Sequence, residues 1–339
     1  MSRKILLAHT GGTIGMHRGA RGFEPRQGHL AELLSRMPEL EDPSMPHITL
    51  VEWGPLLDSA DNRPADWQRM ANEIAAHYDD VDGVVLLHGT DTMAYTSSAL
   101  SFLLEGLGKP VIITGSQVPL AEVRSDAREN LVASLQLAAR TDLHEVCVYF
   151  SGQVLRGCRA TKVSASGFDA FESPNEAPLG QVGVDIAFRA GAPRPAQPGP
   201  LRVPELADVT VASLRLFPGI DARFMRHVLQ EPLQGLVLET FGAGNAPSRD
   251  RDLLAALSEA SARGVVIVNI TQCLRGRVDM GGYATGAALQ DVGAVGGADM
   301  TPEAALTKLI YLLGSGLEPA AVRALMQQDL RGELTPAPA

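Results

Sequence analysis

Two short segments of this chain place hydroxyl side chains directly after apolar runs. The first run lies at residues 5–8 and is followed by TGGT (10–13), and the second lies at 83–87 and is followed by HGTDT (88–92). A short, continuous apolar run is typical of a strand that is buried on both faces. The glycines can adopt backbone angles that other residues avoid, and they leave main-chain N–H groups open to a ligand. Each segment is therefore a candidate site in which threonine hydroxyls stand beside bare backbone.

Together the two segments offer the groups that acyl transfer requires. Thr13 and Thr90 supply hydroxyl nucleophiles, Asp91 supplies a carboxylate, and Lys162 lies in a polar loop that could reach the same place. A threonine hydroxyl is a weak nucleophile and needs a base. A lysine serves as a base only when burial or neighbouring cations favour its neutral form, and a carboxylate opposes this, so the sequence leaves the role of Lys162 open. Main-chain N–H groups near residues 12–13 or 89–90 would stabilise the oxyanion of a tetrahedral intermediate by ~3 kcal/mol per donor.

A purely structural interpretation remains open for each segment taken alone. Residues 10–13 would then be a tight turn whose threonines bond to their own backbone. Thr90 or Asp91 would cap the helix that follows. A shared site becomes the better interpretation if other strands deliver complementary groups to the same edge.

Other chemistries lack their sequence signatures. No GxxxxGK[ST] or GxGxxG segment is present to cradle phosphate, and no GxSxG elbow presents a serine. The eight histidines show no HExxH or Cys/His spacing that would indicate a metal. We therefore expect no metal and no organic cofactor.

The composition narrows the class of protein. The 339 residues include 29 basic and 39 acidic side chains, a formal charge of −10, which argues against binding of nucleic acid. The three cysteines show no CxxC pairing and favour free thiols in a reducing compartment. The apolar part of the N-terminus is too short for a secretory signal, and no segment is long enough to span a bilayer. We expect a soluble cytoplasmic protein that acts on a small molecule and not at a membrane.

Strand-like and helix-like segments alternate along the first half of the chain, which predicts an α/β fold. Besides the two runs above, strands are expected at 48–53, 110–114 and 146–150, and helices at 30–37, 64–78, 93–104 and 125–140. Such alternation implies a parallel sheet that helices cover on both faces, with ligands beyond the carboxyl ends of its strands. Thr13, Thr90, Asp91 and Gln117 would all emerge at that edge.

A proline-dense segment that begins at Gly191 divides the chain. We expect an N-terminal domain with the catalytic residues at 1–190, a linker at 191–207 and a C-terminal α/β domain at 208–339. In the C-terminal domain, strands are expected at 209–216, 235–238 and 265–270, and helices at 250–263 and after Thr301-Pro302.

A polar stretch without periodicity, residues 16–28, follows the first candidate site. We expect a mobile loop there, and a lid over the site and a plain surface connection remain equally open. Phe23 is the one large aromatic residue of the stretch, and we expect it to pack downward when the loop closes.

Longer motifs in the chain resemble the type I, or cytoplasmic, L-asparaginases. The resemblance covers essentially the whole chain, in the motifs TGGTIG (10–15), HGTDTM (88–93), TGSQVPLAEVRSDA (114–127), ATK (160–162), GAGNAP (242–247), NITQC (269–273) and MGGYATG (280–286). It implies a larger N-terminal parallel-sheet domain of flavodoxin type with a left-handed crossover, and a smaller C-terminal α/β domain. The general rule for parallel connections would instead predict right-handed crossovers throughout.

The resemblance also implies catalytic roles. Thr13 would attack the side-chain amide carbon of L-asparagine, ammonia would leave, and water would hydrolyse the resulting β-aspartyl ester. Thr90, Asp91 and Lys162 match the second cluster of the family. In that cluster Thr90 would activate or position the water and help to hold the oxyanion, and Asp91 would pair with the α-ammonium group of the substrate.

Four further residues are implied as substrate-binding. Ser59 matches the position that binds the α-carboxylate, with Asp58 beside it, and Gln117 falls in a motif that lines the pocket. Asn245 would come from a partner subunit, because members of the family assemble as homodimers or as homotetramers built from dimers.

Two positions depart from the family pattern. The family usually has a lid tyrosine ten residues after the nucleophile, whose phenol is thought to assist it. Here Phe23 stands at that position, which would keep the packing but lose the hydrogen bond and predicts a slower enzyme. Some type I enzymes have an allosteric asparagine site with an arginine shortly before the GxGNAP motif. Glu239 occupies that position here, and since a carboxylate would repel a ligand carboxylate, we expect that site to be weak or absent.

The sequence thus favours an asparagine amidohydrolase, with glutamine as a poor second substrate because one extra methylene moves the amide past Thr13. Two alternatives stay open: an amidohydrolase for another small amide, and a non-catalytic amino-acid sensor on the same scaffold. Thr13, Thr90, Asp91 and Lys162 together argue against the sensor, because binding alone does not require two hydroxyls and a lysine.

Overall fold

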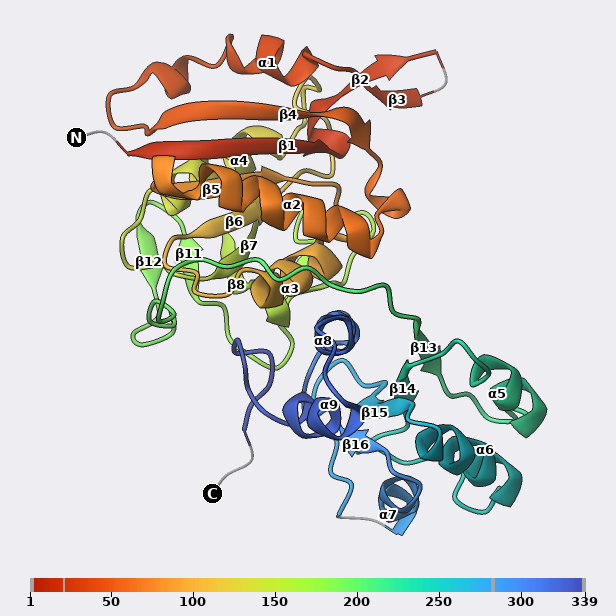
Figure 1. Cartoon of the computed structure of the whole chain (residues 1–339). Coiled ribbons are helices and arrows are strands. Elements are labelled where there is room, and N and C mark those ends of the chain that lie inside the picture. Colours follow the sequence, from red (N-terminus) through yellow and green to blue (C-terminus); the bar gives the residue numbers. More distant parts are fainter. Residues whose placement is uncertain (1–2, 21, 282–283, 337–339) are drawn as a thin grey trace. The chain divides into compact units, whose positions relative to one another are not determined.

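The computed structural model describes residues 3–20, 22–281 and 284–336. It falls into two compact units, Met1–Val203 and Pro204–Ala339 (Figure 1). Residues 282 and 283 of the motif at 280–286 lie outside the described residues. Within the described ranges, the helices are too short or too polar to cross a membrane.

An eight-stranded sheet, in the order β12-β11-β8-β7-β6-β5-β1-β4, forms the centre of the N-terminal unit. Five neighbouring strands run parallel: β4 (His47–Leu57), β1 (Lys4–Gly11), β5 (Gly83–Leu87), β6 (Val111–Thr114) and β7 (Val146–Phe150). The short strands β8 (Gln153–Arg156), β11 (Gly180–Val182) and β12 (Ile186–Phe188) extend it in antiparallel fashion.

The sheet is therefore mostly parallel, as expected from the alternation of strands and helices, with an antiparallel edge that the sequence did not predict. The reason lies between β7 and β8, which only Ser151 and Gly152 separate, both with positive φ. A two-residue connection of this kind makes a hairpin, since a parallel crossover needs a dozen or more residues.

The five parallel strands follow the flavodoxin-type order, with the second strand at the edge and the first beside the third. The strand order reverses between β1 and β5. In open α/β sheets a ligand crevice forms at such a switch point, outside the carboxyl ends of the two strands. The handedness of the crossover stays a prediction.

Helices cover both faces of this sheet. The helices α2 (Pro64–His77) and α3 (Met93–Leu103) lie over one face, and α4 (Ala127–Ala138) lies over the other (Figure 1). On the α4 face, Ile5 and Leu7 of β1 share a buried cluster with Leu131 and Leu135 of α4. Because strand side chains alternate, the residues between them serve the opposite face.

The segment after β1 forms a hairpin and not an irregular loop. A short turn of 3₁₀ helix (Thr13–Gly15) leads into β2 (Met16–Gly19), which pairs antiparallel with β3 (Gly22–Pro25). Phe23 is 42% exposed. Its ring lies under the guanidinium of Arg18, whose Cζ is 4.9 Å from the ring centroid. In this structure Phe23 thus makes a contact within the hairpin, and its downward packing on closure of the segment stays a prediction. The helix α1 (His29–Leu34) and a 3₁₀ turn (Pro38–Glu41) then lead to β4.

Part of the predicted linker is fastened to the N-terminal unit. Gln197 N–H donates to the carbonyl of Leu107 at 3.2 Å, and Arg202 N–H donates to the carbonyl of Glu105 at 2.8 Å. Residues 191–203 therefore run along this unit as an extended strap.

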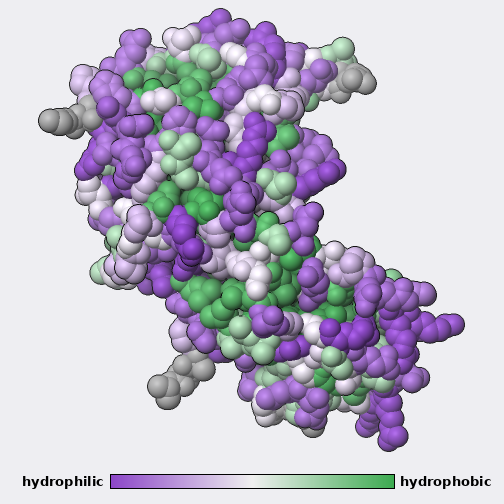
Figure 2. Space-filling model, viewed as in Figure 1, coloured by the Kyte–Doolittle hydropathy of each residue, from purple (hydrophilic) through white to green (hydrophobic). Residues whose placement is uncertain are grey.

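On the face shown in Figure 2 hydrophilic side chains predominate, as expected for a chain with a charge of −10.

The C-terminal unit is a second α/β sandwich. Its parallel sheet has the order β13 (Val211–Arg215), β14 (Gly235–Thr240), β15 (Val266–Thr271) and β16 (Val295–Gly296). One face packs on α5 (Ala222–Val228) and α6 (Arg251–Ala262), and the other on α8 (Pro302–Gly314) and α9 (Pro319–Met326). The helix α7 (Ala284–Asp291) precedes β16. Thr301 caps α8 as predicted, since its hydroxyl accepts from the N–H of Ala304.

Candidate active site

The two hydroxyl-bearing segments meet at their glycines. Gly12, with φ of 86°, follows β1 directly. A Cβ atom on Gly12 would lie 2.4 Å from the main-chain nitrogen of Gly89, and one on Gly89 would lie 2.4 Å from Oγ of Ser59. Gly12 and Gly89 therefore touch through bare backbone, and the Ser59 side chain packs against the backbone of Gly89. Thr13 and Thr90 each follow this contact by one residue, about 3.8 Å along the chain.

Thr10 fastens the end of β1 to β5. The two strands are paired up to His9 and Leu87. The buried hydroxyl of Thr10 donates to the carbonyl of Leu87 at 2.9 Å. Thr10 is thus a structural residue, although its hydroxyl bonds to the neighbouring strand and not to its own turn. This leaves Thr13, which is only partly buried, as the candidate nucleophile of the segment.

Lys162 joins the second segment to a loop far away in the sequence. It lies on β9 (Thr161–Lys162), which pairs with β10 (Phe171–Glu172). Its Nζ donates to Oγ1 of Thr90 at 2.8 Å and to Oδ1 of Asp91 at 2.7 Å. Thr90 is 7% exposed, whereas the side chain of Asp91 is 65% exposed. The cluster therefore has a buried hydroxyl and a carboxylate that a ligand can reach.

Gln117 completes the surroundings of Thr90. The hydroxyl of Thr90 donates to Oε1 of Gln117 at 3.1 Å. The carboxamide of Gln117 donates in turn to the carbonyl of Gly167 at 3.0 Å. Its main-chain N–H donates to both carboxylate oxygens of Asp126, at 3.1 and 3.0 Å. Asp126 thus anchors the loop after β6, a role that the sequence analysis missed although the residue lies within the motif at 114–127.

Asp58 and Ser59 form a turn beside Gly89. Oδ1 of Asp58 accepts from the N–H of Ala60 at 3.0 Å and so caps the short 3₁₀ helix Ser59–Asp61. The carbonyl of Ser59 accepts from the hydroxyl of Thr92 at 2.7 Å. Ser59 is buried against Gly89. In this structure Asp58 shapes the turn that presents Ser59 to the site.

The buried side chain of His88 fastens the second segment, HGTDT, through hydrogen bonds. Sequence reasoning did not recognise this role. Its Nδ1–H donates to the carbonyl of Gly89 at 2.7 Å. Its Nε2 accepts from Nδ2 of Asn62 at 2.7 Å and from the hydroxyl of Thr96 at 2.9 Å. Burial lowers the pKa of His88 to about 4, so the ring is neutral at physiological pH. The one available signal was a histidine that precedes GTDT without any metal-ligand spacing.

Thr13 carries an available hydroxyl and backbone. Among the residues that the structure describes, neither its hydroxyl nor its N–H group donates a hydrogen bond. The N–H group of Thr90 likewise donates to no group in the described part of the chain. A candidate nucleophile and two main-chain donors thus flank the Gly12–Gly89 contact.

Asn245 and Glu239 belong to the C-terminal unit. Asn245 closes a tight turn after β14, where its N–H donates to the carbonyl of Phe241 at 2.8 Å. Glu239 lies on β14, and its carbonyl accepts from Nε2 of Gln272 at 2.9 Å. Asn245 as a contribution to the site and the weak second asparagine site both stay predictions. A sigmoidal rate curve against asparagine would contradict the second of them.

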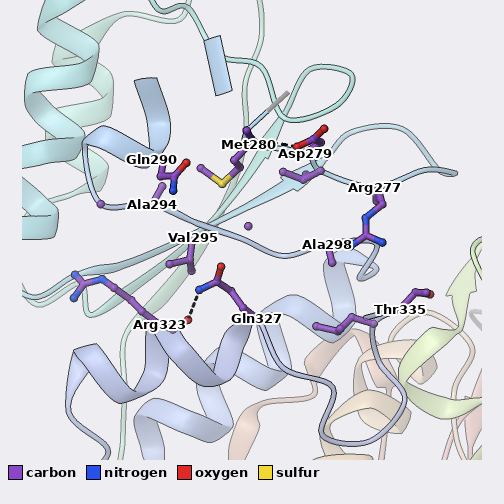
Figure 3. A pocket seen from close by; sticks show the side chains of 15 residues that line it. Arg277, Asp279, Met280, Gln290, Ala294, Val295, Ala298, Arg323, Gln327 and Thr335 are labelled. Carbon is purple, nitrogen blue, oxygen red and sulfur yellow. Dashed lines mark hydrogen bonds between the residues drawn. The ribbon is translucent and has the colours of Figure 1, made fainter. Parts of the chain in front are cut away.

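A separate cavity of about 660 Å³ lies in the C-terminal unit (Figure 3). Arg277, Gln290 and Arg323 are among its lining residues, and Nε2 of Gln327 donates to the carbonyl of Arg323 at 3.2 Å. Within the described part of the chain, none of the eight predicted site residues lines it. The candidate residues Thr13 and Thr90 lie instead just beyond β1 and β5, at the switch point of the N-terminal sheet.

Comparison with known families places both units. Residues 4–194 match the family described as "Asparaginase, N-terminal", and residues 210–326 match the "Glutaminase/Asparaginase C-terminal domain". These matches cover most of the chain, which therefore belongs to the asparaginase family. They also bear out the two-unit α/β architecture that the motifs implied.

Individual relatives refine this assignment. The chain is 52% identical to "L-asparaginase 1" of Escherichia coli (strain K12), over 98% of both chains. The crystal structure of "L-asparaginase I" from Vibrio cholerae superposes with a TM-score of 0.92 at 47% identity, over 99% of this chain and 100% of the other. The human "60 kDa lysophospholipase" is 43% identical over 98% of this chain and 62% of its own length. The resemblance to the type I L-asparaginases, inferred from the motifs, is confirmed by the first two relatives.

Proposed function

We propose that this chain hydrolyses L-asparagine to L-aspartate and ammonia, with Thr13 as the nucleophile. The identity to two L-asparaginases of type I over nearly their full length supports the overall reaction. One observation carries the assignment of residues. Gly12 and Gly89 touch, and each is followed directly by a threonine. Thr13 follows Gly12, and Thr90, which is bonded to Lys162 as part of the cluster with Asp91, follows Gly89.

In the first half of the reaction, Thr13 Oγ1 attacks the side-chain carboxamide carbon of asparagine. The carbonyl oxygen becomes an oxyanion, which the available N–H groups of Thr13 and Thr90 suit as donors. The C–N bond then breaks, and the proton that leaves the threonine hydroxyl ends on the departing ammonia. A β-aspartyl ester on Thr13 remains.

In the second half, water attacks the ester and restores the hydroxyl of Thr13. The oxygen of Thr90 is held between Lys162 Nζ at 2.8 Å and Gln117 Oε1 at 3.1 Å, so its position is well determined. A fixed hydroxyl of this kind can orient the attacking water. Lys162 stabilises the charge that develops on this side of the site.

The α-ammonium and α-carboxylate groups of asparagine would bind at positions separate from the reacting side-chain amide. Asp91 uses Oδ1 for Lys162 and leaves Oδ2 for the α-ammonium group of the substrate. Ser59, held against Gly89, suits the α-carboxylate, with Asp58 shaping its turn. Because these anchors are fixed, the longer side chain of glutamine would carry its amide past Thr13 and react more slowly.

The decisive experiment is a steady-state assay with asparagine and glutamine side by side, in which ammonia and the amino-acid product are both measured. Thr13→Ala should abolish turnover while asparagine binding remains detectable, whereas Thr13→Ser keeps a hydroxyl and should retain measurable activity. Saturable binding without ammonia would favour an amino-acid sensor. Turnover only with another amide would favour the second alternative.

The assembly is a further part of the proposal. We infer a cytoplasmic homodimer, or a homotetramer built from dimers, in which Asn245 of one subunit completes the site of its partner. A complementation test follows: Thr13→Ala and Asn245→Ala chains, each inactive alone, should regain activity when they are unfolded and refolded together. If the mixture stays inactive, Asn245 is not shared between subunits.

A further inference from the structure

We propose that His9 and Glu52 are positioning residues for the nucleophile. They join the turn that carries Thr13 to the segment after the β2–β3 hairpin as one unit, through a steric contact of His9 with Gly15 and hydrogen bonds of Glu52 to His9 and Gly28. The inference rests on the proposed role of Thr13 as the nucleophile, but the unit itself follows from contacts that are independent of the substrate.

His9 supports the nucleophile turn from below. It lies near the end of β1, and its side chain has no exposed surface. A Cβ atom on Gly15, the last residue of the turn Thr13–Gly15, would lie 2.6 Å from Cε1 and 2.7 Å from Nε2 of His9. The imidazole edge is thus in direct contact with the Gly15 backbone, and only glycine fits there.

The hydrogen bonds of His9 determine the state of its ring. Nδ1 lies 3.1 Å from Oε2 of Glu52, and since a carboxylate only accepts, Nδ1 carries the proton. Nε2 is buried and has no hydrogen-bond partner among the described residues. Burial lowers the pKa of His9 despite the opposing effect of Glu52. The ring is therefore neutral, and its unprotonated nitrogen can approach the Gly15 backbone closely.

Glu52 extends the unit from His9 to the hairpin. The two residues are register partners on the neighbouring strands β1 and β4, so their side chains share one face of the sheet. The second carboxylate oxygen, Oε1, accepts from the main-chain N–H of Gly28 at 2.5 Å. The next residue of β4 adds another tie, because Nε2 of Gln27 donates to the carbonyl of Trp53 at 3.0 Å.

These contacts couple two movements that would otherwise be independent. The hairpin runs from Met16 to Pro25, between the turn that His9 supports and Gly28, which Glu52 holds. Gly28 cannot lift from β4 unless Glu52 releases it or moves with it, and any shift of Glu52 reaches His9 and then Gly15. Because both ends of the hairpin are held by these contacts, Thr13 keeps a fixed position at the carboxyl end of β1.

A steric exchange tests the His9–Gly15 contact. Gly15→Ala puts a methyl group into the imidazole edge, and we expect kcat to fall on the order of 10- to 100-fold, as for a displacement of about 1 Å at a reacting group. In a His9→Ala background that methyl group has room. Gly15→Ala should therefore lower kcat much less in that background. The kcat of the double variant should then be higher than the product of the two single fold-losses predicts. Full additivity of the two losses would overturn the contact.

The carboxylate is tested by Glu52→Ala, with Glu73→Ala as the matched control. Glu73 makes the same kind of pair with a histidine, at 3.1 Å to Nε2 of His77, but on the outer helix α2. We expect Glu52→Ala to lower kcat on the order of 10- to 100-fold with KM within about twofold, since Ser59 and Asp91 are untouched, and Glu73→Ala to leave both unchanged. A variant that loses activity only in proportion to its unfolded fraction would show a purely structural role and overturn the proposal.

Hydrogen exchange separates this inference from the proposed function. In Glu52→Ala the amide of Gly28 loses its acceptor, and we expect faster exchange at residues 22–30 and also at 12–16, measured well below the melting temperature. If the unaltered chain releases no ammonia, the proposed function fails, yet this coupled exchange would still establish the unit. Faster exchange at 22–30 alone, with residues 12–16 unchanged, would overturn the coupling itself.

Discussion

Acid should destabilise this protein through His88, which is buried and neutral beneath the HGTDT segment. Its ring is faced by the carbonyl of Gly89, the amide of Asn62 and the hydroxyl of Thr96, and no carboxylate is among these partners. The hydrogen bond to the Gly89 carbonyl favours a protonated ring, but burial outweighs it and lowers the pKa of His88 to about 4 from the usual 6.5. Between these two pH values His88 binds a proton in the unfolded chain but not in the folded chain, so the free energy of unfolding falls as the pH falls.

The size of the effect follows from these two values. Each pKa unit corresponds to about 1.4 kcal/mol, so the whole contribution is roughly 3 kcal/mol, present in full above pH ~6.5 and lost as the pH falls through ~4. Between pH 7 and pH 5 the loss from His88 is about 2 kcal/mol.

The assay is urea unfolding at a series of pH values for the unaltered chain and for His88→Gln. The glutamine oxygen can still accept from Asn62 and Thr96, but the side chain does not titrate. We expect the variant to be less stable by about 1 kcal/mol at pH 7, because the hydrogen bond to Gly89 is lost. Between pH 7 and pH 5 it should lose about 2 kcal/mol less than the unaltered chain. Parallel stability curves for the two proteins would refute a neutral, proton-excluding His88.

Three further outcomes are expected at the site. Gly12→Ala should lower the free energy of unfolding by about 1–2 kcal/mol through its positive φ alone. The methyl group should also push the turn away from Gly89, so that activity in the ammonia assay falls far more than the melting temperature. An active variant would show that this close contact is not required. Lys162→Met should lower kcat on the order of 10²–10⁴-fold because Thr90 loses its 2.8 Å partner, and a rise in KM with kcat unchanged would contradict that role. Phe23→Tyr should raise kcat roughly tenfold if one missing hydrogen bond in the transition state limits the rate, and an unchanged kcat would mean that another group does this work.

Much of the fold could be predicted from local sequence signals. The expected strands at 83–87 and 146–150 agree with β5 and β7 to the residue, because a buried parallel strand is an apolar run with polar or glycine ends. Pro64 begins α2 and Pro302 begins α8, as expected of a residue whose missing N–H costs nothing in the first helical turn. Such signals act within a few residues and survive without tertiary context.

The short strands were out of reach of the same reasoning. The strands of the hairpin β2–β3 and of the antiparallel edge β8, β11 and β12 span three or four residues each, and their burial follows no regular pattern. A segment of that length has no measurable period. Its extended form comes from hydrogen bonds to a neighbouring strand that the segment itself does not specify.

The site divides in the same way. Residue types and motifs alone identified the threonines, the carboxylate and the lysine, because acyl transfer needs these groups. Only the tertiary structure decided that Gly12 touches Gly89, that His88 lies neutral beneath the second segment, and that Glu52 reaches from His9 to Gly28. These contacts join residues 24 to 77 positions apart, and their geometry depends on strand register and burial, which are properties of the packed sheet and not of any one segment.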